Sequence, residues 1–225
     1  MNRMIPIIVV VLAIVAGGAW YLTQGGDTPP SPNNQTEVTS SGDVDTTTDT
    51  SGVVEMVLGN ADAPVELIEY ASFTCPHCAS FHEAVLKPLK ADYVETGKVK
   101  VIFRDVYFDR VGLWASMVAR CGGEERFWGM TDLLMKGQKE WAGSGDPATI
   151  SGELRKVGRL AGLGEEQINA CMQDEAKAKA LVAWSEKNMN GHEISGTPTM
   201  IIDGEKHSNM SYEDLKKVLD AKIGG

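Results

Sequence analysis

The first hydrophobic feature of the chain is a continuous apolar run at residues 4–22, MIPIIVVVLAIVAGGAWYL, which follows Arg3. A helix of this length spans the roughly 30 Å of a hydrocarbon core at about 1.5 Å per residue. The positive charge before the run favours a cytoplasmic N-terminus. We therefore expect residues 1–22 to be an N-terminal membrane anchor. A cleaved signal sequence with a site near Ala19 is the alternative, and both export the rest of the chain.

A polar segment follows at residues 23–52, which is rich in Gly, Pro, Ser, Thr and Asp and almost free of apolar side chains. This composition cannot build a core, so we expect a disordered polar linker. The linker holds five acids and no base, and the whole chain has 31 acids and 21 bases. Without the linker and Arg3, residues 53–225 keep 26 acids and 20 bases. This mildly acidic part of the chain gives no indication of nucleic acid as a partner.

From residue 53 onward the hydrophobic period switches between that of a strand and that of a helix. Residues 53–58, 65–72 (VELIEYAS) and 98–106 (KVKVIFRDV) are rich in β-forming side chains and predict strands. Between the last two, apolar residues recur every four positions from Cys75 to Gly97, which predicts one face of a helix. These residues are Phe81, Val85, Leu89 and Tyr93. Strand, helix and strand in this order predict the βαβ unit of a mostly parallel sheet.

The second half of the domain is predicted to be helical until its last segment. Glycine clusters at residues 122–123, 143–145 and 162–164 divide the helix-forming region 111–190 into several helices. The run SGTPTMIIDGEKH then predicts a strand at residues 199–202, an Asp203-Gly204 turn and a short second strand. A final helix begins after Ser211, with Asp214 three residues on, as in a capping box. Residues 53–225 are thus expected to form one domain.

All four cysteines, Cys75, Cys78, Cys121 and Cys171, lie in this domain, and an even number in an exported domain indicates disulfides. The first two stand in FTCPHC, residues 73–78, at the junction of a strand and a helix. A structural zinc site needs four ligands, and no second C-x-x-C follows, so we expect neither metal nor cofactor. A passive structural disulfide remains the other alternative. His82, four residues after Cys78, is interpreted as a solvated or substrate-facing side chain.

Cys75 has the position of a reactive thiol. It precedes the first turn of a helix, where free N–H groups and the helix dipole favour a thiolate and lower its pKa. Pro76 fixes φ and removes one N–H donor, and it is tolerated at the first helical position. The ring of His77 can donate a hydrogen bond to the Cys75 thiolate. Phe73 and Thr74, beside the motif, are candidates for an exposed rim that contacts substrate.

Three local features together resemble the DsbA family of extracytoplasmic thiol:disulfide oxidoreductases. They are CPHC at a strand-to-helix junction, GTPT before a later strand, and Glu69 on the strand six residues before Cys75. The resemblance covers essentially all of residues 53–225. It implies an α/β thioredoxin fold, with a central mixed sheet flanked by helices and an inserted helical domain at about residues 111–190.

The resemblance also implies roles for individual residues. A buried Glu69 would take and return the proton of Cys78, although an edge position open to solvent is the alternative. Thr197-Pro198 would form a cis-proline loop beside the dithiol, and the Thr197 backbone would pair with an extended substrate. An ordinary trans turn is the alternative there. Cys121 and Cys171 would form a structural disulfide, as in some relatives, and two unpaired core cysteines are the alternative.

The expected function is that of an oxidase that introduces disulfide bonds into folding exported proteins. Family resemblance implies a quinone-linked membrane partner that re-oxidises Cys75 and Cys78. We expect a monomer on the periplasmic side of the inner membrane, anchored by residues 4–22. The alternatives are a disulfide isomerase or reductase, a peptide-binding chaperone module and a metal carrier. Thr197 departs from the valine of some strongly oxidising relatives, so the reduction potential is left open.

Overall fold

The structure is a computed structural model, and it describes residues 48–224. These residues belong to one unit. The predicted membrane anchor and all but the last five residues of the predicted linker lie outside the described residues. Within residues 48–224, no helix is long and apolar enough to cross a membrane.

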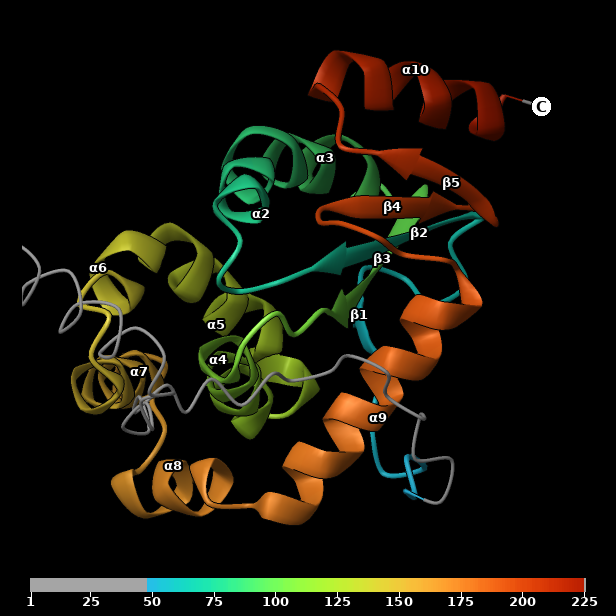
Figure 1. Ribbon diagram of the computed structural model, residues 1–225. Coiled ribbons are helices and arrows are strands. Elements are labelled where there is room, and N and C mark those ends of the chain that lie inside the picture. The colour runs from blue at the N-terminus through green and yellow to red at the C-terminus, as the bar shows by residue number, and fades with distance from the viewer. Residues whose placement is uncertain (1–47, 225) are drawn as a thin grey trace, which may run out of the picture. The chain divides into compact units, whose positions relative to one another are not determined.

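A five-stranded mixed sheet forms the centre of the domain, with the strand order β1-β3-β2-β4-β5 (Figure 1). The long strands β2 and β3 are parallel, and β1, β4 and β5 join antiparallel. The parallel pair is connected through a helical segment, which confirms the predicted βαβ unit. The strands are β1 (Met56–Leu58), β2 (Val65–Ala71), β3 (Val99–Asp105), β4 (Thr199–Ile202) and β5 (Glu205–Ser208).

The β4–β5 hairpin and the last helix form as their short sequence signals predict. Asp203 and Gly204 both have positive φ, 47° and 84°, which suits the two-residue turn of a hairpin. Helix α10 (Tyr212–Ile223) begins after Ser211, whose side chain accepts a hydrogen bond from the Asp214 N–H. The Ser211 hydroxyl also donates to the Asp214 carboxylate. Helix α10 is thereby fixed at its start, next to the helices that cover one face of the sheet.

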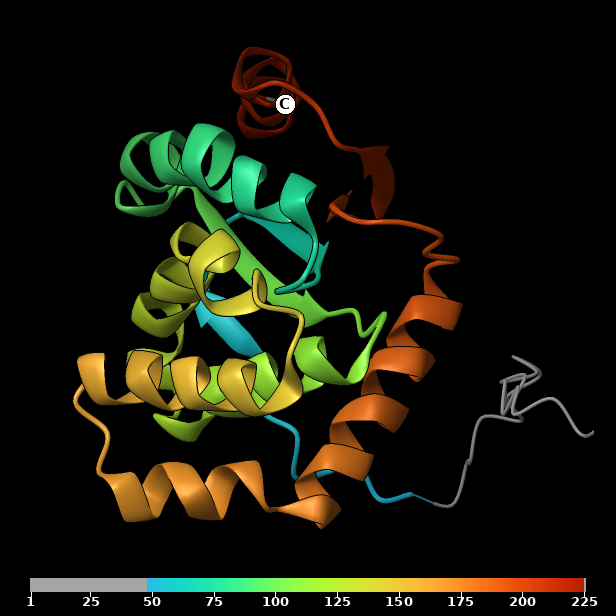
Figure 2. The same ribbon diagram turned by 60° about the vertical axis from the view of Figure 1, so that its left-hand side comes forward.

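One face of the sheet is covered by α10 and by a continuous helical segment at residues 76–94 (Figures 1 and 2). This segment consists of α2 (Pro76–Phe81), η1 (His82–Leu86), α3 (Lys87–Leu89) and η2 (Lys90–Val94). Its wider η turns lie on either side of Pro88, which has no N–H to donate to the preceding turn. All four residues of the predicted apolar face are buried against the sheet. They are Phe81, Val85, Leu89 and Tyr93.

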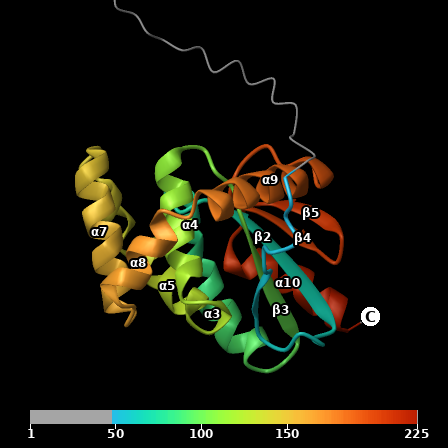
Figure 3. The same cartoon turned by 90° about the horizontal axis from the view of Figure 1, so that it is seen from below.

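The predicted helical region lies between β3 and β4, and it forms a second layer whose core also includes Phe103 of β3 and the two cysteines of α2 and its N-cap. The breaks at all three glycine clusters are confirmed, and two further breaks occur at Gly137 and at residues 173–174. Helix α9 returns along the other face of the sheet, whereas α7 and α8 lie farther from it (Figure 3). The helices are α4 (Arg110–Cys121), α5 (Glu124–Lys136), α6 (Gln138–Ala142), α7 (Pro147–Leu160), α8 (Glu165–Met172) and α9 (Glu175–Gly191).

A buried ion pair ties this helical layer to the end of β3. Arg120 on α4 donates from Nη2 and Nε to the Asp105 carboxylate at 2.6 and 3.0 Å. A third donation, from Nη1 to the Val54 carbonyl at 2.8 Å, reaches the segment before β1. Both side chains of the pair are almost fully buried. The pair therefore fixes the insertion against the sheet, and neither charge can turn to water if its partner is removed.

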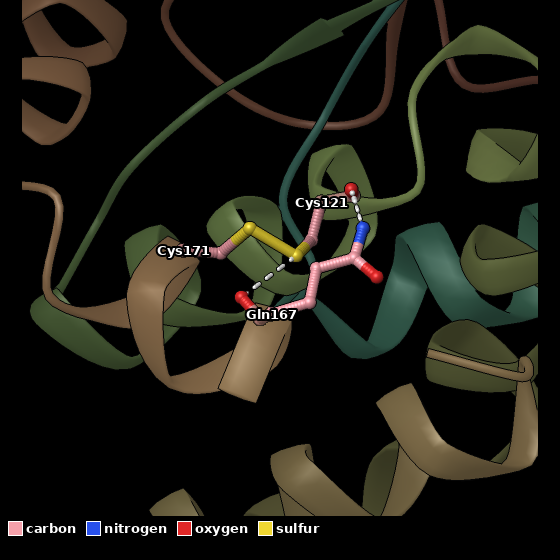
Figure 4. Close-up of a disulfide and its surroundings, with 3 residues drawn as sticks. All are labelled: Cys121, Gln167 and Cys171. Carbon is pink, nitrogen blue, oxygen red and sulfur yellow. Dashed lines mark hydrogen bonds between the residues drawn. A yellow bond between two sulfur atoms is a disulfide. The ribbon is translucent and has the colours of Figure 1, made fainter. Parts of the chain in front are cut away.

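A disulfide ties two helices of the insertion together. Cys121, at the end of α4, is bonded to Cys171 on α8 (Figure 4). Gln167, one turn before Cys171, adds a hydrogen bond from its side-chain amide to the Cys121 carbonyl at 3.1 Å. The disulfide closes α5, α6, α7 and most of α8 into a loop with a sequence separation of 50 residues. The structure thus contains the second cysteine pair that the sequence analysis considered.

Replacement of Asp105 by Asn should destabilise the domain by about 3 kcal/mol, because it leaves the Arg120 charge buried without a counter-ion. The measurement is the free energy of unfolding in denaturant. Glu83→Gln is the matched control, because the Glu83–Lys87 pair is exposed and such pairs contribute less than about 1 kcal/mol. Equal losses in both variants would contradict this account of Asp105 and Arg120.

The double variant Cys121→Ser/Cys171→Ser should lose about 4 kcal/mol of stability in the chain-entropy account of a loop this long. The unfolded state of the variant gains conformational freedom that the disulfide denies to the wild type. Unfolding curves of the two proteins under non-reducing conditions provide the test. Unchanged stability would show that the disulfide does not restrict the unfolded chain.

Candidate active site

The candidate active site begins where β2 ends and α2 starts. Cys75 has extended backbone angles (φ −86°, ψ 117°) and occupies the N-cap position, and Pro76 is the first helical residue. The proline fits there because the first N–H groups of a helix have no partner within the helix. The Cys75 carbonyl accepts from the N–H groups of Cys78 and Ala79. The dithiol thus lies across the first turn of α2, as the sequence predicts.

The helical layer holds the loop that leads into this turn. Gln138, at the start of α6, donates from its side-chain amide to the Phe73 carbonyl at 2.7 Å and to the Cys75 carbonyl at 3.0 Å. The Thr74 hydroxyl donates to the Asp109 carboxylate at 3.0 Å. Asp109 also caps α4 by accepting from the Gly112 N–H at 2.7 Å. Two contacts from the insertion therefore fix the backbone on which Cys75 stands.

The predicted exposure of Phe73 is wrong. Its side chain is only 1% exposed, and its ring stacks on that of Phe103 with 5.3 Å between the centroids. Phe73 follows a buried strand, and its ring turns inward because a large apolar face on β3 is available to it. Thr74 is partly exposed and bonded to Asp109. Of the predicted rim, only Thr74 lies at the surface.

The sulfur of Cys75 is nearly buried and lies beside the loop before β4. Its side chain is 9% exposed, and Sγ lies 3.5 Å from the carbonyl oxygen of Thr197. Burial alone would raise the pKa of the Cys75 thiol, but hydrogen bonds from the Thr197 side chain and from the backbone N–H groups of Cys78 and His77 lower it overall. The His77 ring is exposed. The contribution of His77 to this lower pKa thus comes through its backbone.

Cys78, one turn further along α2, has the opposite environment. Its side chain is fully buried, and burial raises the pKa of its thiol strongly. The nearby negative charge of Glu69 raises that pKa further. At neutral pH, Cys78 is therefore a thiol, and Cys75 forms the thiolate more readily than Cys78 does. Both cysteines are free in this structure, which thus shows the reduced dithiol.

Glu69 is buried, as the sequence predicts, and it has a partner that the sequence analysis placed elsewhere. Its carboxylate is fully buried on β2 between Phe103 of β3 and Met200 of β4. His82 Nε2 lies 3.1 Å from each of the two carboxylate oxygens. The interpretation of His82 as solvated or substrate-facing is therefore wrong. His82 follows Cys78 by four residues, and this spacing turns it to the same inner side of the helix.

The loop before β4 completes the site. The Thr197–Pro198 peptide bond is cis, and the Thr197 carbonyl faces the Cys75 sulfur. In the thiol form that the structure shows, the Thr197 hydroxyl is buried and has no hydrogen-bond partner among the described residues, so its bond to sulfur belongs to the thiolate form. The hydroxyl is therefore free to donate to a thiolate at Cys75. Pro76 and His77 lie at the surface beside this loop, so an extended chain can approach the sulfur there.

The structure brings together the dithiol, Glu69 and the Thr197-Pro198 loop, whereas the second cysteine pair lies in the insertion. Sequence reasoning missed Gln138 and Asp109, because polar residues at helix starts carry no sign of which distant loop they bind. Within residues 48–224, no group of three or more His, Cys, Asp or Glu side chains is placed to hold a metal ion. The arrangement suits thiol chemistry at Cys75 with proton exchange at Cys78.

Comparisons with known proteins agree with this geometry. A family model described as thioredoxin matches residues 51–221. The crystal structure of Wolbachia pipientis alpha-DsbA1 is similar at a TM-score of 0.69 and 27% sequence identity, over 76% of this chain and 91% of that one. Disulfide bond formation protein D of Bacillus subtilis is 26% identical over 75% of this chain and 77% of its own length.

A putative protein-disulfide oxidoreductase of Rickettsia bellii is 31% identical over 170 residues, which are 75% of this chain. The match covers 64% of the rickettsial protein, and 62% of its counterpart in Rickettsia typhi. The chain thus spans less than two thirds of the length of these relatives. The thioredoxin fold with an inserted helical domain, expected from the sequence, is confirmed.

Thr197→Val should raise the pKa of Cys75, because the variant loses the hydroxyl that donates to the thiolate. Thiolate absorbance against pH measures this change. Thr199→Val is the matched control, because the Thr199 hydroxyl donates to the Gly196 carbonyl at 2.7 Å and not to the Cys75 sulfur. The control should leave the Cys75 titration unchanged. An unchanged Cys75 titration in Thr197→Val would contradict the role given to its hydroxyl.

The same pKa makes the stability of the reduced protein depend on pH. The folded pKa of Cys75 is lowered, so its contribution is fully present above the unfolded value near 8.5 and is lost as pH falls through the folded pKa. Reduced wild type should therefore exceed reduced Thr197→Val in unfolding free energy at high pH, and the two should converge at low pH. A difference that stays constant with pH would contradict this linkage.

Proposed function

This chain belongs to the thioredoxin family, and from that membership we propose that it is an extracytoplasmic thiol:disulfide oxidoreductase that introduces disulfide bonds into folding exported proteins. The observation that carries the proposal is the difference between two sulfurs on one helical turn. Cys75 occupies the N-cap of α2 with a little exposed surface and a lowered pKa, whereas Cys78 has no exposed surface and a raised pKa. Stabilisation of a thiolate favours the reduced dithiol and so makes the disulfide the more oxidising form.

The reaction begins from the Cys75–Cys78 disulfide. A substrate thiolate attacks the Cys75 sulfur, the Cys75–Cys78 bond breaks, and Cys78 leaves with the electron pair and takes up a proton. A second substrate thiolate then attacks the substrate sulfur of the mixed disulfide and releases Cys75 as a thiolate. Two electrons pass from the substrate thiols to the Cys75–Cys78 disulfide, which becomes the dithiol. Glu69, beside Cys78, supplies the proton to its leaving sulfur.

The surface around Cys75 supports binding of an extended substrate. The Thr197 backbone beside the sulfur is suited to pair with a substrate strand, and Thr74, directly before the motif, is partly exposed. Pro76 and His77, within the motif, are exposed. The proposed substrates are therefore unfolded or folding proteins with free thiols, which can present a cysteine in an extended segment.

The proposed location follows from the sequence before the domain. Residues 4–22 would anchor the chain in the inner membrane, and residues 23–52 would act as a polar linker that places the domain on the periplasmic side. A membrane partner, quinone-linked by family resemblance, would re-oxidise the dithiol. Each cycle leaves Cys75 and Cys78 reduced, so an electron acceptor is required. The domain would act as a monomer.

The main rival within the same chemistry is a disulfide isomerase or reductase, which would need a reduced dithiol at the steady state. The lowered pKa of Cys75 stabilises the reduced dithiol, which makes the dithiol a poor electron donor and its disulfide a good electron acceptor. Net oxidation of substrates is therefore the favoured direction. A peptide-binding chaperone module is the rival without redox chemistry. The opposite environments of the two sulfurs favour the oxidase over the chaperone, because peptide binding requires neither a stabilised thiolate nor a buried thiol.

The oxidised protein should convert a reduced, unfolded substrate protein to its disulfide form while one equivalent of its own dithiol appears. Cys75→Ser and Cys78→Ser should each abolish net oxidation, because either change removes the disulfide. The double variant Cys121→Ser/Cys171→Ser is the matched control and should keep the activity while folded. Substrate thiols are counted by alkylation.

Three results would contradict the proposal. Oxidation that survives Cys75→Ser would show that another group reacts. Folding assistance that survives both active-site substitutions would favour the chaperone. Activity only toward substrates with mispaired disulfides, and only from the reduced protein, would favour the isomerase.

A further inference from the structure

One buried titratable side chain has no part in the exchange steps at the sulfurs. His82 is only 6% exposed, and its ring meets that of Phe103 edge to face with 6.0 Å between centroids. Nε2 lies 3.1 Å from both oxygens of Glu69. Nδ1, on the other side of the ring, has no hydrogen-bond partner among residues 48–224. One end of the imidazole is thus bonded to the buried acid, and the other end is free.

His82 also lines a cleft of about 490 Å³ between η1 and α5, called here the η1–α5 cleft. The charged side chains of this cleft come from η1, α3, η2 and α5. The buried Nε1 of Trp128, on the α5 wall, likewise has no hydrogen-bond partner within the described part of the chain. Two buried polar groups, one on each wall, favour an ordered water beside the cleft, because such groups need a partner. The charged residues are Glu83, Lys87, Lys90, Asp132 and Lys136.

We propose that His82 transfers protons between Glu69 and the η1–α5 cleft, and that it thereby connects the buried Cys78 to solvent on the side of the helix away from the substrate. The proposal rests on the proposed function, because it concerns the proton that Cys78 gains and loses in each cycle. Cys78 itself has no exposed surface, so its proton must pass through a neighbouring group. Glu69 is that neighbour, and Glu69 is fully buried as well.

The proton steps balance in both directions. When the Cys75–Cys78 bond opens, the Cys78 thiolate takes a proton from protonated Glu69. The Glu69 carboxylate then takes the proton on His82 Nε2, while Nδ1 accepts one from water in the cleft. When Cys78 attacks a mixed disulfide at Cys75 during re-oxidation, the same transfers run in reverse. One proton moves in each direction per cycle, and no electrons follow this path.

His82 is a positioning and relay residue, and a substitution can separate the two roles. In His82→Gln, the side-chain amide can still donate a hydrogen bond to Glu69, but it cannot pass a proton from one nitrogen to another. In His82→Ala, the space of the ring opens toward the η1–α5 cleft, where added imidazole can enter. A relay predicts that imidazole restores the lost rate, whereas a hydrogen bond that only orients Glu69 predicts that His82→Gln behaves as wild type.

The loss of the Cys78 proton can be followed with an aromatic disulfide reagent that releases a coloured thiolate. The reagent reacts with the reduced full-length chain in two phases. Attack by Cys75 releases the first equivalent of colour and forms a mixed disulfide. Attack by Cys78 on that disulfide releases the second equivalent and requires loss of the Cys78 proton. His82→Gln should leave the first phase unchanged and slow the second by about tenfold or more. His207→Gln, another histidine near a glutamate, is the matched control and should change neither phase.

The pH dependence of the second phase distinguishes a relay from a structural role. The wild-type profile should contain a titration that is missing in His82→Gln, and imidazole should accelerate the second phase of His82→Ala but not of wild type. A second phase that is equally fast in His82→Gln would overturn the proposal. So would a slow phase with the wild-type pH profile, which would indicate distortion alone. If His82→Ala does not fold, the profile of His82→Gln decides.

Failure of the proposed function would look different in the same experiment. A wild-type protein that shows no first phase, or no second phase, lacks a competent dithiol, and the oxidoreductase proposal itself would fail. Two phases in wild type with no effect of His82→Gln would leave the oxidoreductase intact and remove only the relay.

Discussion

The opposite environments of Cys75 and Cys78 are the constraint on which the rest of this domain depends. Both sulfurs belong to one turn of α2, yet Cys75 lies at the N-cap among hydrogen-bond donors and Cys78 lies in the core beside Glu69. Burial opposes charge on either sulfur, so the pKa values differ because hydrogen bonds at the N-cap stabilise a thiolate at Cys75, whereas the Glu69 charge opposes one at Cys78. Movement of the loop before α2 would reduce this difference between the two sulfurs.

The helical layer contributes to the site by holding that loop. Gln138 binds two carbonyls on either side of Thr74, and Asp109 binds the Thr74 hydroxyl while it caps α4. The layer is itself fixed to β3 through Arg120 and Asp105. The insertion therefore positions the reactive turn from one side, and the Thr197-Pro198 loop approaches it from the other.

The fold and the residues that surround the two sulfurs could be predicted from the sequence. Hydrophobic period, glycine breaks and the CPHC and GTPT motifs are local signals, and the elements that they predict are present. The errors concern side-chain direction. Phe73 was expected at the surface because it adjoins a reactive motif, but the ring of Phe103 on β3 draws it inward. The interpretation of His82 as solvated or substrate-facing fails because its spacing from Cys78 places it on the inner side of the helix, beside Glu69.

Contacts between distant segments could not have been predicted from one sequence. Gln138 lies 63 residues from Cys75, and nothing in its local pattern names the carbonyls that it binds. The same holds for Asp105 and Arg120, whose charges look like ordinary surface residues until the sheet and α4 bury them. Polar residues that become buried are assigned by tertiary packing, and hydrophobic periodicity carries little information about them.

The reduction potential of the Cys75–Cys78 pair tests the central claim most directly. It is obtained by equilibrating the full-length protein with glutathione buffers and trapping free thiols. If the site stabilises the Cys75 thiolate as its contacts indicate, the potential should lie above about −200 mV, well above the roughly −270 mV typical of thioredoxin. Each 30 mV of that difference corresponds to about 1.4 kcal/mol that favours the reduced form. A potential near or below that of thioredoxin would contradict the account.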